Sequence, residues 1–292
     1  MKRTIVASAL AATLVFSCRK KEEPAPVAPP PVTTSSVAAP APPATVAPAT
    51  ATVPDVALAH APMPTNGLEL WLRGDYGVTA DATGKVSSWA VEGSPLKGGV
   101  KDPAESPSLV AAAINGKPAV RFDGEHNMLE VPMNIGAVVS PELTVISVWS
   151  SATADKSPLR KLYGADDGGY DRAAGIDDRA ADGSNYTVFA GSGAVAGIFT
   201  FAANTPTLTI ESYANKKLNA WVNGAVAKAN IDAEYGPMPD TFFIGCTGRV
   251  YHEQWKGDLA EMLVYKRTLT DDERKKAEDY LAGKYGLKLA GR

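Results

Sequence analysis

Residues 24–64 limit most strongly what this chain can fold into. These 41 residues include 12 Pro and 12 Ala, a single charged residue, Asp55, and no aromatic side chain. Such a segment has too little apolar bulk to form a hydrophobic core, and its prolines favour an extended polyproline II conformation. All 26 glycines of the 292-residue chain fall at or after Gly67. We therefore predict an extended Pro/Ala-rich linker at 18–65 and one folded domain at 66–292.

The first 17 residues have the pattern of an export signal. Lys2 and Arg3 precede an uncharged apolar run at 4–16. This run is shorter than the roughly 20 residues that a transmembrane helix needs, and its length is typical of a signal peptide. We predict a signal peptide at 1–17.

The end of this segment, Val15-Phe16-Ser17-Cys18, resembles the bacterial lipobox, in which a small residue precedes a cysteine that receives lipid. The resemblance implies lipid attachment at Cys18 and a membrane anchor formed by the attached acyl chains. The residue after the cysteine is Arg19, which by resemblance to bacterial sorting signals favours the outer membrane. An ordinary signal peptide cleaved elsewhere is the alternative.

Composition excludes several classes of protein. The formal net charge is −3 and the basic residues are scattered, so we expect no nucleic-acid partner. The second of the two cysteines, Cys246, lies in an apolar run and is predicted to be a buried, inert thiol. No nucleophile elbow, phosphate-binding glycine loop or paired-cysteine motif is present in the sequence. We expect a monomeric domain.

The domain has many short runs of β-favouring residues separated by turn residues. Asn223-Gly224 lies between two such runs and predicts a hairpin, because both residues tolerate positive φ. The predicted strands are 68–72, 119–122, 128–131, 143–149, 186–190, 198–201, 208–212, 218–222, 242–246 and 259–265.

One helix is predicted, near the C-terminus. Thr270 and Glu273 form a capping box, and Gly286 is placed for the C-cap. The apolar stripe of this helix consists of Ala277, Tyr280, Leu281 and Tyr285. Many strands with a single terminal helix predict an all-β fold, a two-sheet antiparallel jelly-roll sandwich with a short C-terminal helix.

Several segments together resemble a laminin G-like domain of the concanavalin A-like lectin/glucanase superfamily. The resemblance covers 67–288 and rests on 70–73 (LWLR), 84–89 (GKVSSW), 115–124 (NGKPAVRFDG), 221–224 (WVNG), 257–265 (GDLAEMLVY) and the following 269–287. It implies a jelly roll, often with bound calcium, that binds carbohydrate or protein more often than it catalyses a reaction.

Glu125 and Glu130 are candidate catalytic residues. Glycosidases on this sandwich use the pattern Glu-x-Asp-x-x-Glu, with nucleophile and acid/base on one face of a strand. The spacing of the two glutamates matches, but Asn127 replaces the aspartate. The alternative puts Glu125 in a loop and Glu130 on the outer side of a strand, and we predict that the domain is not an enzyme.

An acidic, glycine-rich stretch at 164–185 is the candidate metal site. Its carboxylates are suitable oxygen donors for calcium. The alternative is a solvated loop in which Arg172 and Arg179 pair with the aspartates. The predicted calcium ligands are Asp166, Asp167, Asp171, Asp177 and Asp178.

Tyr170 and Tyr251 are the candidate ligand-binding residues. Both lie among polar loop residues, whereas the five tryptophans are expected to pack in the domain. We therefore expect an envelope-anchored lipoprotein whose laminin G-like domain binds carbohydrate or protein, with calcium as a candidate cofactor. The alternatives are a carbohydrate-active enzyme that uses Glu125 and Glu130, and an envelope lipoprotein with a purely structural role.

Overall fold

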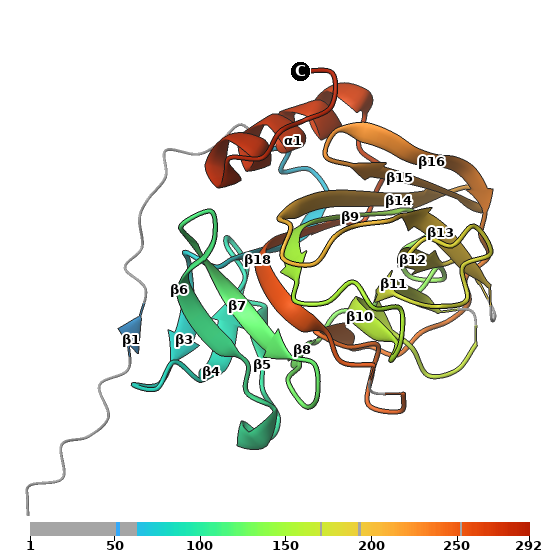
Figure 1. Cartoon of the computed structure of the whole chain (residues 1–292). Coiled ribbons are helices and arrows are strands. Elements are labelled where there is room, and N and C mark those ends of the chain that lie inside the picture. Colours follow the sequence, from blue (N-terminus) through green and yellow to red (C-terminus); the bar gives the residue numbers. More distant parts are fainter. Residues whose placement is uncertain (1–50, 53–62, 170, 192–193, 252) are drawn as a thin grey trace, which may run out of the picture. The chain divides into compact units, whose positions relative to one another are not determined.

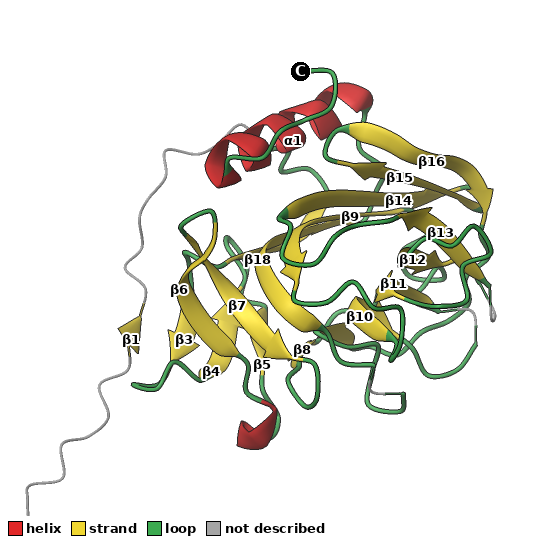
Figure 2. Cartoon of the chain, viewed as in Figure 1, coloured by secondary structure: helices red, strands yellow, loops and turns green. Residues whose placement is uncertain are grey.

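The computed structural model describes residues 51–52, 63–169, 171–191, 194–251 and 253–292. These residues belong to one structural unit, 47–292, which contains the predicted domain. The unit consists of two sheets and one α-helix, α1 (Asp271–Tyr285), with a short 3-10 helix at Pro103–Glu105 (Figures 1 and 2). The predicted all-β, two-sheet sandwich with a C-terminal helix is confirmed.

The larger sheet contains ten strands. In spatial order they are β1 (Ala51–Thr52), β3 (Val78–Ala80), β4 (Val86–Ala90), β5 (Lys97–Gly99), β8 (Leu129–Val131), β17 (Phe242–Ile244), β10 (Arg160–Ala165), β11 (Arg172–Ile176), β12 (Tyr186–Phe189) and β13 (Val195–Phe199).

The second sheet contains eight strands, and one of them, β2 (Leu68–Arg73), pairs only with β18. The others, in spatial order, are β16 (Ala225–Asp232), β15 (Lys217–Val222), β14 (Thr207–Ala214), β9 (Leu143–Ser151), β18 (Lys256–Tyr265), β7 (Lys117–Asp123) and β6 (Ser108–Ile114).

The central strand β9 is buried along its whole length. Val145 and Trp149 face the core between the sheets, whereas Ile146 and Val148 face the outer side, where α1 packs (Figure 1). Because both faces are covered, this strand lacks the polar alternation of a half-exposed strand.

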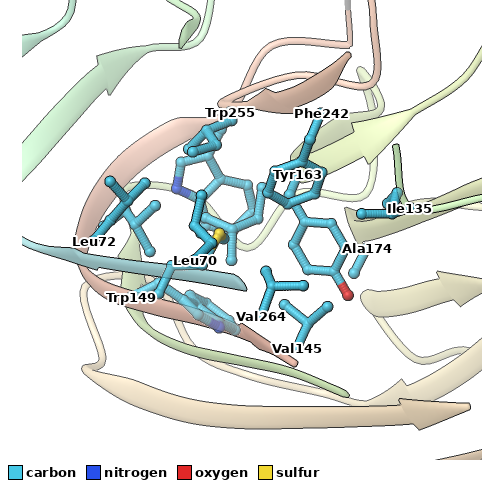
Figure 3. Packing of buried hydrophobic residues seen from close by; sticks show 14 of the residues in the cluster. Leu70, Leu72, Ile135, Val145, Trp149, Tyr163, Ala174, Phe242, Trp255 and Val264 are labelled. Carbon is cyan, nitrogen blue, oxygen red and sulfur yellow. The ribbon is translucent and has the colours of Figure 1, made fainter. Parts of the chain in front are cut away.

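Large side chains from both sheets fill the core (Figure 3). The Trp149 ring stacks on Tyr186 with centroids 5.0 Å apart and meets the Trp255 ring edge to face at 5.3 Å. Trp89, Trp149 and Trp255 are fully buried, so these tryptophans pack as predicted.

The local signals at the hairpin and the helix are confirmed. Asn223 and Gly224 have φ of 46° and 82° and connect β15 to β16. The Thr270–Glu273 capping box is formed, and Gly286 adopts the left-handed conformation as the C-cap. Cys246 is also buried as predicted, and burial raises the pKa of its thiol to about 12.

The acidic stretch at 164–185 is not one continuous loop. Residues 172–176 form β11, which pairs with β10 and β12. Its sequence, Arg-Ala-Ala-Gly-Ile, has no alternation of apolar and polar residues, because all five residues are buried. The aspartates of this stretch therefore belong to the two opposite ends of a strand.

Several predictions concern residues outside those described. They are the signal peptide at 1–17, the lipid site at Cys18, all of the 18–65 linker except 51–52 and 63–65, and Tyr170. In the described part of the chain, no helix has the length and apolar character that a membrane crossing requires.

Candidate functional site

A cavity of about 200 Å³ lies at the β10–β11 turn. The β12–β13 turn and the segment that follows β17 also border it. This segment lies along β10, because the Asp166 N–H donates to the Thr247 carbonyl at 3.1 Å and the Lys161 N–H donates to the Glu253 carbonyl at 2.7 Å. Residues about 80 positions apart in the chain thus meet at one site.

The cavity brings together three of the predicted site residues, Asp166, Asp171 and Tyr251. The Tyr251 side chain is 49% exposed. Gly168 has a φ of 95°, a conformation that favours glycine, and a Cβ at this position would lie 2.7 Å from the Tyr251 hydroxyl. Asp167 is exposed in the same turn.

Asp166 and Asp171 form a carboxyl pair. The Gly168 N–H donates to Asp166 Oδ1 at 2.9 Å and to Asp171 Oδ2 at 3.2 Å. Asp171 is only 2% exposed. Burial, together with the hydrogen bond and charge of Asp166, raises the pKa of Asp171 to about 7. A carboxyl group that titrates near neutral pH can both donate and accept a proton.

The other two predicted calcium ligands lie at the far end of β11. Asp178 is exposed. Asp177 is fully buried, where Lys161 Nζ lies 2.7 Å and Arg179 Nη2 lies 2.5 Å from its Oδ2. Burial opposes ionisation, but the hydrogen bonds and charges of Arg179 and Lys161 lower the pKa of Asp177 to about 2. Its oxygens are thus engaged by cations of the chain.

The five aspartates do not form one cluster. Over the ranges that the structure describes, no three or more His, Cys, Asp and Glu side chains are grouped so that they could hold a metal ion. The calcium site stays a prediction from the sequence.

Sequence reasoning missed two residues of the cavity wall, Phe189 and Glu253. The Phe189 ring lies 4.6 Å from Lys161 Nζ and 5.4 Å from the Arg179 guanidinium carbon. Burial raises the pKa of Glu253. Neither residue belongs to a local motif, and only the pairing of distant segments reveals them. The alternative prediction, in which Arg179 pairs with an aspartate, is confirmed, because Arg179 forms an ion pair with Asp177.

Arg172 does not pair with an aspartate. Its guanidinium carbon lies 4.5 and 4.8 Å from the ring centroids of Tyr213 and Tyr235, which also contact each other edge to face. It also donates to the Ser140 carbonyl at 2.9 Å. The side chain therefore belongs to the core between the sheets and not to the acidic turn.

The structure gives Glu125 and Glu130 different surroundings. Glu125 is exposed in a turn, where its N–H donates to Asp123 Oδ1 at 2.8 Å. Glu130 is the outward residue of β8, between the buried Leu129 and Val131, and forms an ion pair with Arg249. This placement agrees with the alternative reading of the Glu125–Glu130 motif as a loop followed by a strand.

Arg249 fixes the segment that presents Tyr251. Its two terminal nitrogens donate to the Glu105 carboxylate at 2.8 and 3.0 Å, and its Nε donates to Glu130. These charge-assisted bonds connect the segment to β8 and to the 3-10 helix, and they restrict the position of the tyrosine. Glu130 thus helps to hold the segment that carries Tyr251, although it does not line the cavity itself.

Comparisons with known proteins give structural matches only. No family model and no curated protein matches the chain. The sialidase of Trypanosoma rangeli in complex with sialic acid matches with a TM-score of 0.53 and 14% identity, over 76% of this chain and 34% of the sialidase. The complex of that sialidase with 2,3-difluoro-KDN matches with a TM-score of 0.54 and 13% identity, over 76% of this chain and 33% of the sialidase. The binding domain of botulinum neurotoxin DC in complex with SialylT matches with a TM-score of 0.50 and 9% identity, over 74% of this chain and 51% of the toxin chain.

This chain spans about a third of the length of the matching sialidase chains. At these identities the likeness establishes the shared fold. The prediction that the domain is not an enzyme is nevertheless contradicted, because the matching structures include sialidases, which are glycoside hydrolases. The resemblance to laminin G-like domains implied a binding protein more often than an enzyme. The fold alone does not distinguish a binding domain from an enzyme.

Proposed function

We propose that the cavity beside Tyr251 binds a carbohydrate. The observation that carries this proposal is the half-exposed Tyr251 ring at the rim of a cavity walled by Asp166, Asp171 and Glu253. A flat aromatic ring packs against the apolar face of a sugar, and carboxyl oxygens accept hydrogen bonds from its hydroxyls. The volume of about 200 Å³ is below the usual roughly 300–1,000 Å³ of ligand pockets, so we expect one sugar unit inside.

The Tyr251 segment is also preorganised for binding. The ion pairs of Arg249 with Glu105 and Glu130 hold it before a ligand arrives. A contact residue that is already ordered loses less conformational entropy on association.

For the whole chain, the proposed role is an envelope lipoprotein that displays this domain. The support is the export signal at 1–17, the lipobox-like cysteine Cys18 and the Pro/Ala-rich linker at 18–65. Ala51 and Thr52 already pair with β3, so the spacer is the part that precedes them, 24–50. Over these residues, polyproline II at about 3.1 Å per residue extends to roughly 80 Å. Outer-membrane attachment and a laminin G-like domain are parts of the same proposal.

Glycan titration of the full chain tests the binding site. We expect Tyr251→Ala to weaken glycan binding about tenfold, since an aromatic contact of about 1.5 kcal/mol corresponds to roughly that factor. Val250→Ala is the matched control, because Val250 is adjacent and 65% exposed. If calorimetry across a glycan panel detects no binding, the structural lipoprotein role is favoured and the proposal is wrong.

The Asp166–Asp171 pair favours a second candidate function, hydrolysis of a glycosidic bond. The protonated carboxyl would donate its proton to the glycosidic oxygen as the C–O bond breaks, and the neighbouring carboxylate would take a proton from the attacking water. Asp166 Oδ1 and Asp171 Oδ2 accept from the same Gly168 N–H and so lie closer together than the roughly 6.5–9.5 Å of inverting glycosidases, so the substrate and water would approach beside the pair.

Product analysis in the same titrations tests this candidate. Asp171→Asn should abolish the release of reducing sugar while the glycan still binds, whereas the exposed Glu125→Gln should leave both unchanged. Turnover that persists in Asp171→Asn would rule out the pair as the catalytic group.

A further inference from the structure

The charges at the cavity indicate the class of glycan that fits it. Four charged side chains line the cavity among the described residues, namely Asp166, Asp171, Glu253 and Arg179. Arg179 is already used within the wall, because its Nε donates to Asp177 Oδ1 at 2.8 Å and its Nη2 to Asp177 Oδ2 at 2.5 Å. A ligand would therefore compete with a buried carboxylate for this guanidinium.

Around the cavity, carboxyl groups outnumber positively charged groups. Lys161 is fully buried behind the cavity, and with Arg179 it faces two carboxyl groups, Asp177 and Glu253. These four charges balance within the wall. The Asp166–Asp171 pair has no cation of its own among the described lining residues.

Two buried carboxyl oxygens of the wall have no hydrogen-bond partner, Asp171 Oδ1 and Glu253 Oε2. Asp171 and Asp166 can hydrogen-bond to each other only while one of them holds a proton. Leaving a buried carboxyl oxygen unpartnered costs free energy. Both residues line the cavity, so a small shift of either side chain would let a ligand N–H or O–H donate to an oxygen that no described group uses.

On the basis of the proposed function, we infer that the cavity selects glycans with a free, protonated amino group over acidic glycans. An ammonium group has three donors and no acceptor, which suits a wall of carboxyl oxygens. It also gains from the aromatic face of Tyr251, because a cation is attracted to the ring. An acidic sugar such as sialic acid would instead bring a carboxylate toward like charges, although sialic acid is bound by a sialidase of the same fold.

The charged groups around Asp171 are Asp166 and Asp167 of its own turn, Glu253 of the facing segment and Arg179. Carboxyl groups outnumber cations around this side chain, which favours a cationic ligand over an anionic one.

The experiment is calorimetry of the full chain at pH 6, where most amino groups of the free-amine probe are protonated, with three probes. They are chitosan oligosaccharide, its fully N-acetylated counterpart of the same length, and sialyllactose. We expect the free-amine probe to bind at least tenfold more tightly than the N-acetylated one. Asp171→Asn and Glu253→Gln should each reduce that ratio at least threefold, whereas Asp155→Asn, which removes an exposed charge elsewhere, should not.

The outcomes separate this inference from the proposed function. If the N-acetylated or sialylated probe binds as tightly as the free amine, the amine selectivity is wrong although carbohydrate binding stands. If amine binding is lost in a chelator, a metal ion and not the ammonium occupies the carboxyl pair, which also overturns the inference. If none of the probes and no other glycan binds, the proposed function itself fails. The ratio of the two affinities, for the free-amine and the N-acetylated probe, is compared only among variants whose melting curves match that of the wild type.

Discussion

At the scale of single residues, Glu211 is an acidic side chain placed in an apolar environment. It is buried in the core, where Tyr186 Oη donates to it at 2.9 Å and Tyr163 Oη at 3.3 Å. Burial raises the pKa of Glu211 to about 7 in spite of these hydrogen bonds. The native state therefore holds a proton here that the unfolded chain releases near pH 4.5.

This proton makes stability depend on pH. Because the native pKa is the higher one, the contribution of Glu211 is complete below about pH 4.5 and is lost as pH rises through about 7. Glu211→Gln should reduce the loss of unfolding free energy between pH 5 and pH 8, by up to about 3 kcal/mol at 1.36 kcal/mol per pKa unit. Urea denaturation at both pH values measures this. Equal pH dependence in wild type and variant, with Glu125→Gln as control, would contradict it.

At the scale of elements, the C-terminal helix is the best specified local structure in the domain. Its apolar side, which includes Ala277, Leu281 and Tyr285, covers the outer face of β9, β14 and β18. The Tyr285 hydroxyl donates to the buried Glu261 at 2.8 Å, and Tyr280 meets Trp71 edge to face at 6.2 Å. The start of the helix depends on the capping box, in which Thr270 Oγ1 accepts from the Glu273 N–H at 3.3 Å.

Removing this cap should weaken the domain measurably. Thr270→Ala is expected to cost about 1 kcal/mol, because an N–H at the helix start loses its acceptor. For a domain of this size that corresponds to a decrease in melting temperature of roughly 2–4 °C. Thr270→Ser keeps the hydroxyl and should restore most of the difference in a thermal melt. Equal melting temperatures for the Ala and Ser variants would show that the cap contributes nothing.

Two of the strands that the sequence analysis did not predict, β10 and β11, share a physical reason. They contain Lys161 and Arg172, charged residues that a local hydrophobic pattern does not place in a buried strand. In the fold these cations are buried, Lys161 against Asp177 and Arg172 against two tyrosine rings. Partners that lie elsewhere in the chain made burial possible, and a local hydrophobic pattern cannot reveal them.

At the scale of the whole molecule, the chain combines a domain with an N-terminal segment of a different composition. The proposed lipid anchor at Cys18 would hold the domain at a membrane by about 0.8 kcal/mol per buried methylene. The proposed linker would then keep the binding cavity away from that surface.

Growth with labelled palmitate tests the anchor. The wild-type protein should incorporate label and sediment with membranes, whereas Cys18→Ala should lose the label and leave the membrane fraction. Cys246→Ala is the matched control, because that thiol is buried in the domain. Label that survives in Cys18→Ala would rule out lipid attachment at this residue.

The sequence by itself determined the elements whose signals are local. A capping box, an Asn-Gly turn and apolar runs act through neighbours a few residues away, so they predicted the helix, the hairpin and the sandwich. Tertiary structure alone decided which of five aspartates lie together. β11 separates Asp171 from Asp177, and the segment after β17 brings Tyr251 and Glu253 to the Asp166–Asp171 pair. Strand pairing between distant segments makes this selection, and spacing along the chain does not encode it.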